Sequence, residues 1–165
     1  QLPKGAQFRA AAPLPAGDTE IVVAADGDGK NEAVVNQLFE LMNEGDTKGA
    51  FGLMADDIVM SNNYEPEDTS GKKAFEALHA EMSKAFVDQK SEAKNCYAAG
   101  TYVVCETAWT ATWKGKAMGM KPTGKTGTVH GLDVYVVKGD KIAKISEYAN
   151  GLEFAASFGM LDAKK

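Results

Sequence analysis

Two acidic residues in the second half of the chain are placed where they could handle protons. Asp133 interrupts the apolar, strand-like run GLDVYVV, with Leu132 and Val134 on either side. A carboxyl group in apolar surroundings loses hydration, which raises its pKa and makes it a candidate acid or base near neutral pH. The alternative for Asp133 is a strand residue whose carboxylate is simply hydrated or paired with a lysine.

Glu147 lies on the next predicted strand, IAKISEYAN, which follows the turn KGDK. A turn at residues 138–140 lets Asp133 and Glu147 approach each other on neighbouring strands. Two carboxylates in one apolar site repel each other, so one of them should keep its proton. Such a pair suits acid–base chemistry, whereas a surface glutamate in a lysine-rich strand is the alternative for Glu147.

The sequence offers little for other kinds of active site. It has two histidines far apart, no clustered Cys/His ligands, no glycine-rich phosphate loop and no nucleophile elbow. The turn ADGDGKNE begins like a calcium loop, but Lys30 occupies the next ligand position and the final glutamate is missing. We therefore expect this turn to cap a helix.

Length and composition indicate one ordinary globular domain. The chain has 165 residues, of which 44% are hydrophobic and 25% charged, and its net charge is −5. It contains no run rich in lysine and arginine, which argues against nucleic acid and anionic membranes as partners. It also contains no apolar stretch long enough to predict a membrane span.

The first residues differ in composition from the rest of the chain. Residues 1–20 include Pro3, Pro13 and Pro15 without a periodic apolar pattern, so we expect an extended leader or linker. A single domain should then occupy residues 21–165, in which residues 21–25 could add a short edge strand. Such a start is typical of an exported protein after removal of its signal peptide. Trimming of a cytoplasmic protein would look the same.

The elements that must position the two acids change character along the chain. The first half is helical in pattern, with a helix capped by Asn31 and ended by Gly45, a short second helix, and a third helix capped by Ser70. From about Gln89 onward the apolar pattern has the period of strands. Helices first and antiparallel strands last predict an α+β domain, in which a curved sheet wraps around the N-terminal helices.

Taken in order, these segments resemble the nuclear-transport-factor-2-like superfamily of cone-shaped α+β barrels, and within it the SnoaL-like polyketide and ester cyclases. The resemblance covers about residues 31–161 and includes NQLFELMNEGD, LMADDIVMSNN and GLDVYVVKGDKIAKISEY. The loop GMKPTGK is similar to the family's G-x-P-P-T-G-K connection. The resemblance implies a ligand in the open mouth of the cone, no metal or organic cofactor, and association through the open face of the sheet.

The resemblance also suggests which side chains surround the ligand. It implies that Asp133 aims its carboxyl group into the cone. Glu147 is similar to the acid of an E-H-W-D-type motif whose histidine and tryptophan are absent here. Aromatic walls with few polar groups suit a flat or hydrophobic organic ligand, although core packing without a ligand fits the same residue types. The predicted lining residues are Asn62, Tyr64, Trp109, Trp113 and Tyr135.

Departures from the family pattern leave the function open between two classes. Asn62 and Leu38 stand where ketosteroid isomerase has its general-base aspartate and oxyanion-binding tyrosine, which argues against that activity. His130 is three residues from Asp133, so strand alternation should send it to the opposite face. The first hypothesis is a pocket protein for a small hydrophobic organic molecule, with Asp133 and Glu147 as the catalytic groups if it is a cofactor-free cyclase or isomerase. The second is a non-catalytic ligand-binding or interaction module that forms a homodimer through its sheet face.

The two cysteines, Cys96 and Cys105, flank the same predicted hairpin. If four residues connect the strands and Ala98 pairs with Val103, Cys96 lies directly opposite Cys105, within reach of a disulfide bond. A two-residue loop at residues 99–100 would shift the register and leave two free thiols. Oxidation of an exported protein would form the bridge, since disulfides persist in oxidising compartments.

Overall fold

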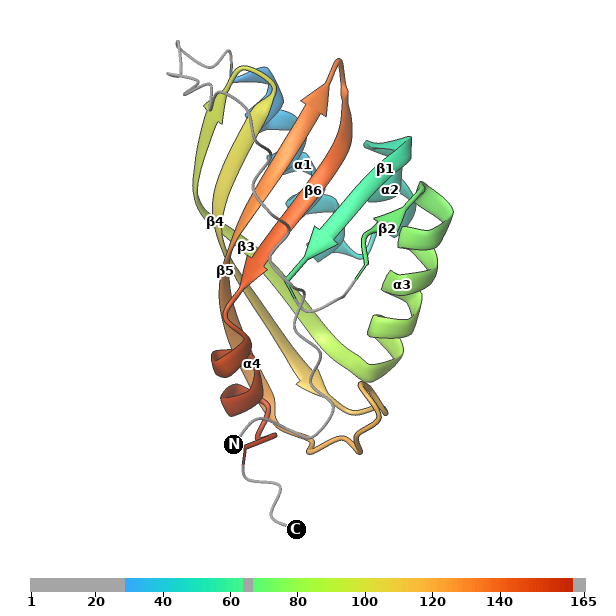
Figure 1. Ribbon diagram of the computed structural model, residues 1–165, viewed down its shortest axis with the longest axis vertical. Coiled ribbons are helices and arrows are strands. Elements are labelled where there is room, and N and C mark those ends of the chain that lie inside the picture. The colour runs from blue at the N-terminus through green and yellow to red at the C-terminus, as the bar shows by residue number, and fades with distance from the viewer. Residues whose placement is uncertain (1–28, 64–66, 162–165) are drawn as a thin grey trace.

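The computed structural model describes residues 29–63 and 67–161. The expected leader, the expected strand at residues 21–25 and Tyr64 lie outside the described residues. The described chain is an α+β domain built on a curved, open sheet of six strands (Figure 1). In that view α1 passes behind the upper part of the sheet, α3 lies beside β1 and β2, and α4 lies near the lower end. The helices are α1 (Lys30–Glu44), α2 (Thr47–Gly52), α3 (Lys72–Ala85) and α4 (Gly151–Ser157).

The sheet has the strand order β2-β1-β6-β5-β4-β3. Neighbouring strands run antiparallel except β1 and β6, which pair in parallel, so the sheet is mixed rather than antiparallel throughout. The parallel pair arises because the last strand of the meander returns beside β1, the first strand of the described residues. The strands are β1 (Met54–Asn62), β2 (Thr69–Ser70), β3 (Phe86–Ala99), β4 (Tyr102–Trp113), β5 (Thr126–Lys138) and β6 (Lys141–Ala149).

The helix ends differ from the sequence prediction at their N-termini. The N-cap of α1 is Gly29 rather than Asn31, and the amide of Asn31 instead donates a hydrogen bond to the carbonyl of Gly100 at 2.7 Å. The N-cap of α3 is Gly71 rather than Ser70. The end of α1 is confirmed, because Gly45 adopts the left-handed conformation at φ 79°, which costs glycine little.

Two apolar clusters cover the inner face of the sheet at opposite ends. The first packs Val35 and Leu38 of α1 against residues of β4, β5 and β6. The second contains Phe158, which follows α4, and Phe86 at the start of β3. Gly127 permits this close approach, since a Cβ there would lie 2.8 Å from Cβ of Ser157. The stretch of inner face between the two clusters is the setting for the polar residues described below.

The hairpin between β3 and β4 has the predicted register. Ala98 pairs with Val103 and Cys96 pairs with Cys105, and the two sulfur atoms form a disulfide bond. The connection is shorter than expected, because Ala99 and Tyr102 form one more pair and only residues 100–101 make the turn. The extra pair leaves the register unchanged, so the bridge forms despite the two-residue turn. No helix in the described part of the chain is long and apolar enough to span a membrane.

Removal of the disulfide should destabilise the fold. The two cysteines are 9 residues apart in sequence, and closing a loop of that size in the unfolded chain contributes roughly 2 to 3 kcal/mol. We expect the double variant C96A/C105A to lose about that amount of unfolding free energy in urea titrations. Dithiothreitol should lower the stability of the wild type and leave the double variant unchanged. Two free thiols in the oxidised, denatured wild type would contradict the bridge.

Candidate functional site

A row of paired residues crosses five strands on the inner face of the sheet. Asn62 of β1 pairs with Glu147 of β6, and Glu147 pairs with Asp133 of β5. Asp133 in turn pairs with Cys105 of β4, which pairs with Cys96 of β3. Side chains of cross-strand partners point to the same face of a sheet. The register therefore places both predicted acids side by side with Asn62 next to them.

The carboxyl group of Asp133 is held by two hydroxyl groups. The hydroxyl of Tyr135 donates a hydrogen bond to Oδ2 of Asp133 at 3.2 Å, and the hydroxyl of Thr107 donates another. Burial raises the pKa of Asp133 to about 6, and the two hydrogen bonds limit that rise because they stabilise the carboxylate. The structure thus places Asp133 where the sequence predicted it, on the inner face with a pKa raised by desolvation.

Glu147 has a different environment from its partner. Burial raises the pKa of Glu147 to about 7, and the negative charge of Asp133 adds to that rise. Its side chain makes no hydrogen bond with any described residue. No lysine, arginine or histidine among the described residues contributes to the pKa of either acid. The pair therefore has the property expected of two carboxyl groups in one apolar site, namely that one proton stays bound near neutral pH.

Aromatic side chains lie beyond the row on both sides. Tyr135, a predicted lining residue, is buried and meets the ring of Phe39 of α1 edge-on, with centroids 6.2 Å apart. Trp109 lies farther along β4, where it pairs with Val129 and stacks on Phe154 of α4 with centroids 6.3 Å apart. Tyr135 is thus in direct contact with Asp133, and Trp109 lies toward the other end of the same face.

Trp113, another predicted lining residue, is placed away from the acids. It is only 1% exposed, stacks on Phe86 and donates its indole N–H to the carbonyl of Gly115 at 2.6 Å. This is the environment of a core residue, the alternative that the sequence left open. His130 lies on the outer face, as expected, where Nδ1 and Oε1 of Glu153 are 2.8 Å apart.

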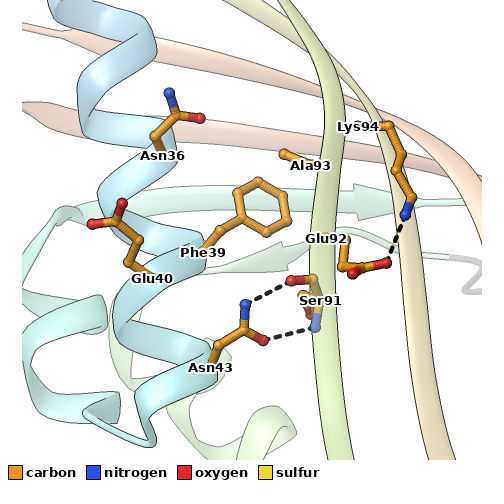
Figure 2. Close-up of a pocket in the computed structure, with 8 residues that line it drawn as sticks. All are labelled: Asn36, Phe39, Glu40, Asn43, Ser91, Glu92, Ala93 and Lys94. Carbon is orange, nitrogen blue, oxygen red and sulfur yellow. Dashed lines mark hydrogen bonds and ion pairs between the residues drawn. The ribbon is translucent and has the colours of Figure 1, made fainter.

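A groove that the sequence did not indicate lies between α1 and β3 (Figure 2). It has a volume of about 440 Å³ and a largely polar lining. Asn43 fixes one end of it by two hydrogen bonds to the backbone of Ser91, at 2.7 and 2.8 Å. The ring of Phe39 points into the groove in Figure 2, and it is the same ring that contacts Tyr135. One side chain thus borders both the groove and the surroundings of the acids. The groove is lined by Asn36, Phe39, Glu40, Asn43, Ser91, Glu92, Ala93 and Lys94.

Comparisons with known proteins identify a family and a shared fold. Residues 32–157 match the family described as SnoaL-like polyketide cyclase, whereas a search of curated proteins found no match. A candidate SnoaL-like polyketide cyclase from Jannaschia sp. CCS1 has a TM-score of 0.72 and 16% identity, over 86% of this chain and 97% of that one.

Two proteins from Streptomyces are similar to this chain as well. AclR of Streptomyces galilaeus, a candidate hydroxylase, has a TM-score of 0.69 and 23% identity, over 80% of this chain and 97% of that one. IdmH of Streptomyces antibioticus, a candidate polyketide cyclase, has a TM-score of 0.68 and 19% identity, over 78% and 98% respectively. Because all three identities are low, these likenesses show the fold alone.

Replacement of Glu147 by glutamine should stabilise the protein at high pH. The pKa of Glu147 rises from 4.5 to about 7, so the folded state binds this proton more tightly than the unfolded state. Stability should therefore fall as pH rises through this interval, and the full cost of ionisation should be present above it. We expect E147Q to gain about 3 kcal/mol of unfolding free energy at pH 8 and almost none at pH 4.

Urea titrations at both pH values measure this difference. The matched control is E76Q, which changes an exposed glutamate of α3 and should show no such dependence on pH. A gain of equal size at pH 4 and pH 8 would show that Glu147 does not bind its proton more tightly in the folded state.

Proposed function

The chain belongs to the SnoaL-like polyketide cyclase family, and from this premise we propose that it binds a small hydrophobic carbonyl compound and acts on it by acid–base chemistry. The observation that carries the proposal is the cross-strand pair of Asp133 and Glu147 on the inner face. Burial raises the pKa of both groups toward neutrality, which is where a general acid or base works best.

The chemistry that suits this pair is the removal of a proton next to a carbonyl group, followed by ring closure or a shift of a double bond. One carboxylate can accept the C–H proton while the neighbouring carboxylic acid donates to the carbonyl oxygen. Both functions come from protein side chains, so the proposed reaction needs no metal or organic cofactor. Asn62 beside Glu147, and Tyr135 and Trp109 along the same face, are the proposed ligand contacts, together with the predicted Tyr64.

Exchange with deuterated water tests the proposal without knowledge of the natural substrate. Flat polycyclic ketones with an acidic C–H would first be screened by ligand-observed NMR, and bound compounds would be incubated in D₂O. A ketone that is deprotonated in the site should take up deuterium next to its carbonyl. We expect D133N and E147Q to lower this enzyme-dependent rate by about 10²-fold or more, since general acid–base catalysis contributes 10² to 10⁴.

The control for this experiment is E76Q. Glu76 is an exposed residue of α3 and belongs neither to the inner face nor to any proposed contact, so its variant should keep the wild-type rate. Binding without deuterium uptake would contradict the catalytic part and favour the non-catalytic module. Failure of every ketone to bind would contradict the proposed ligand class as well.

We also propose that the outer face of the sheet is the contact surface of a homodimer. Leu132 and Tyr148 form a cross-strand pair on this face, and they are 40% and 57% exposed. Tyr97 is 62% exposed and pairs with Val104, which pairs with Val134. The apolar side chains thus extend across four neighbouring strands. In a two-fold symmetric dimer, this patch would pack against the same patch of a second copy of the chain.

A charged side chain within this patch should weaken the dimer. We expect the wild type to elute as a dimer in size-exclusion chromatography with light scattering, and L132E to elute as a monomer at the same concentration. The control is L152E, which changes a leucine of α4 that is 69% exposed and lies outside the patch. A monomeric wild type, or an L132E variant that remains dimeric, would contradict this contact surface.

For the cellular location we propose an oxidising compartment outside the cytoplasm. The disulfide between Cys96 and Cys105 supports this proposal, because such bonds are rare in cytoplasmic proteins. The bond bears directly on the fold, since it joins the edge strand β3 to β4 within the same row as the two acids.

A further inference from the structure

The two acids of the pair differ in the hydrogen-bond donors that reach them. Asp133 accepts hydrogen bonds from the hydroxyl groups of Tyr135 and Thr107, whereas Glu147 accepts none from any described residue. A donor stabilises a carboxylate and favours its ionised form, while a buried carboxyl group without donors keeps its proton. Burial raises the pKa of both groups, and hydroxyl donors limit that rise only for Asp133.

We propose that Thr107 and Tyr135 are positioning residues that hold Asp133 as the carboxylate and leave the shared proton on Glu147. Asp133 is then the proton acceptor of the site and Glu147 its proton donor. The assignment of these two roles to a reaction rests on the proposed function, but the distribution of the proton does not.

Local backbone features bring Thr107 to Asp133. Thr107 pairs directly with Gly131, two residues before Asp133 on β5. A Cβ at Gly131 would lie 3.4 Å from Oγ1 of Thr107 and 3.2 Å from the carbonyl oxygen of Tyr148. Because Gly131 has no side chain, no Cβ crowds the hydroxyl of Thr107 where it approaches the carboxyl group of Asp133. Tyr135 reaches the same carboxyl group from the other side, since residues two apart on a strand point to one face.

Among the described residues, the elements around the two acids bring no further charged group to them. On β4 the cross-strand neighbour Cys105 is part of the disulfide and does not titrate. Asn62 of β1, beside Glu147, is uncharged, and α1 contributes the apolar ring of Phe39 against Tyr135. The pKa of Tyr135 lies well above its usual value, owing to burial and to the two acids, so its hydroxyl remains a donor. Neutral hydroxyl donors, and no ion pair with a described residue, thus distinguish the surroundings of Asp133 from those of Glu147.

With this distribution of the proton, the pair can catalyse ring closure by aldol addition and return to its starting protonation state. In the first step Asp133 takes the C–H proton next to one carbonyl group, and Glu147 gives its proton to that carbonyl oxygen, which produces an enol. In the second step the enol carbon bonds to a second carbonyl carbon, whose oxygen takes the proton from Asp133. Glu147 then recovers the enol O–H proton, and the pair returns to its starting state without another reactant.

Site-resolved titration of the full chain, with the disulfide intact, tests the distribution of the proton. Carbon-13 NMR of labelled aspartate and glutamate carboxyl groups would follow both signals between pH 4 and pH 9, assigned with D133N and E147Q. We expect Asp133 to lose its proton before Glu147 in the wild type. T107V and Y135F each remove one hydrogen bond to the carboxylate, which should raise the titration midpoint of Asp133 by about one pH unit. Asp133 should then lose its proton at about the same pH as Glu147, or after it.

Two control variants separate this effect from a general disturbance of the sheet. T110V makes the same change on the outer face of β4, where Thr110 and Thr128 share a hydrogen bond, and Y102F removes the exposed tyrosine hydroxyl at the start of β4. Both should leave the two midpoints unchanged. The proposal is overturned if Glu147 ionises first in the wild type, or if T107V and Y135F move neither midpoint. No ligand or turnover enters the measurement, so its outcome is independent of the deuterium-exchange test.

Discussion

Two carboxyl groups side by side on an apolar sheet face are a cost to folding, and the surrounding structure keeps them there. The two apolar clusters of the inner face hold the strands of the row in place on either side of the acids. Val35 and Leu38 of α1 hold one end of the inner face, and Phe158 and Phe86 hold the other. The disulfide ties the edge strand β3 to β4 in the same row. Apolar burial at the ends thus supports a polar row between them, which fits the proposal that the row is a functional site.

Much of this arrangement was predictable from local sequence. The apolar run around Asp133 indicated a strand, the family resemblance implied an inward carboxyl group, and the KGDK turn let Glu147 approach it on the next strand. The register of Cys96 and Cys105 was predictable because it can be counted outward from the turn. The irregularity of β3 between Ala93 and Asn95 begins only beyond this pair. Predictions of this kind succeed because the period of two along a strand and a short turn together determine which residues face each other.

Other features depend on contacts between segments that are distant in sequence. Asn31 was a good candidate for a helix cap, but in the fold its amide binds Gly100, 69 residues away. Trp113 has the residue type of a ligand wall, yet its position against Phe86 is fixed by how β3 and α4 pack. The groove between α1 and β3 likewise depends on the docking of Asn43 at the backbone of Ser91. No local pattern carries this information, so sequence analysis alone could not supply it.

Side chains alternate between the two faces along β5 and β6, so the register that determines the inner pair also determines the outer pair. Asp133 and Glu147 form one cross-strand pair, and Leu132 and Tyr148 form the next pair along the same two strands, on the opposite face. A slip of one residue in this hairpin would exchange the two faces and expose the acids while burying the outer pair. Any partner that covers Leu132 and Tyr148 therefore favours the register that keeps Asp133 beside Glu147. In this way, a contact on the outer face can stabilise the geometry of a site that it never touches.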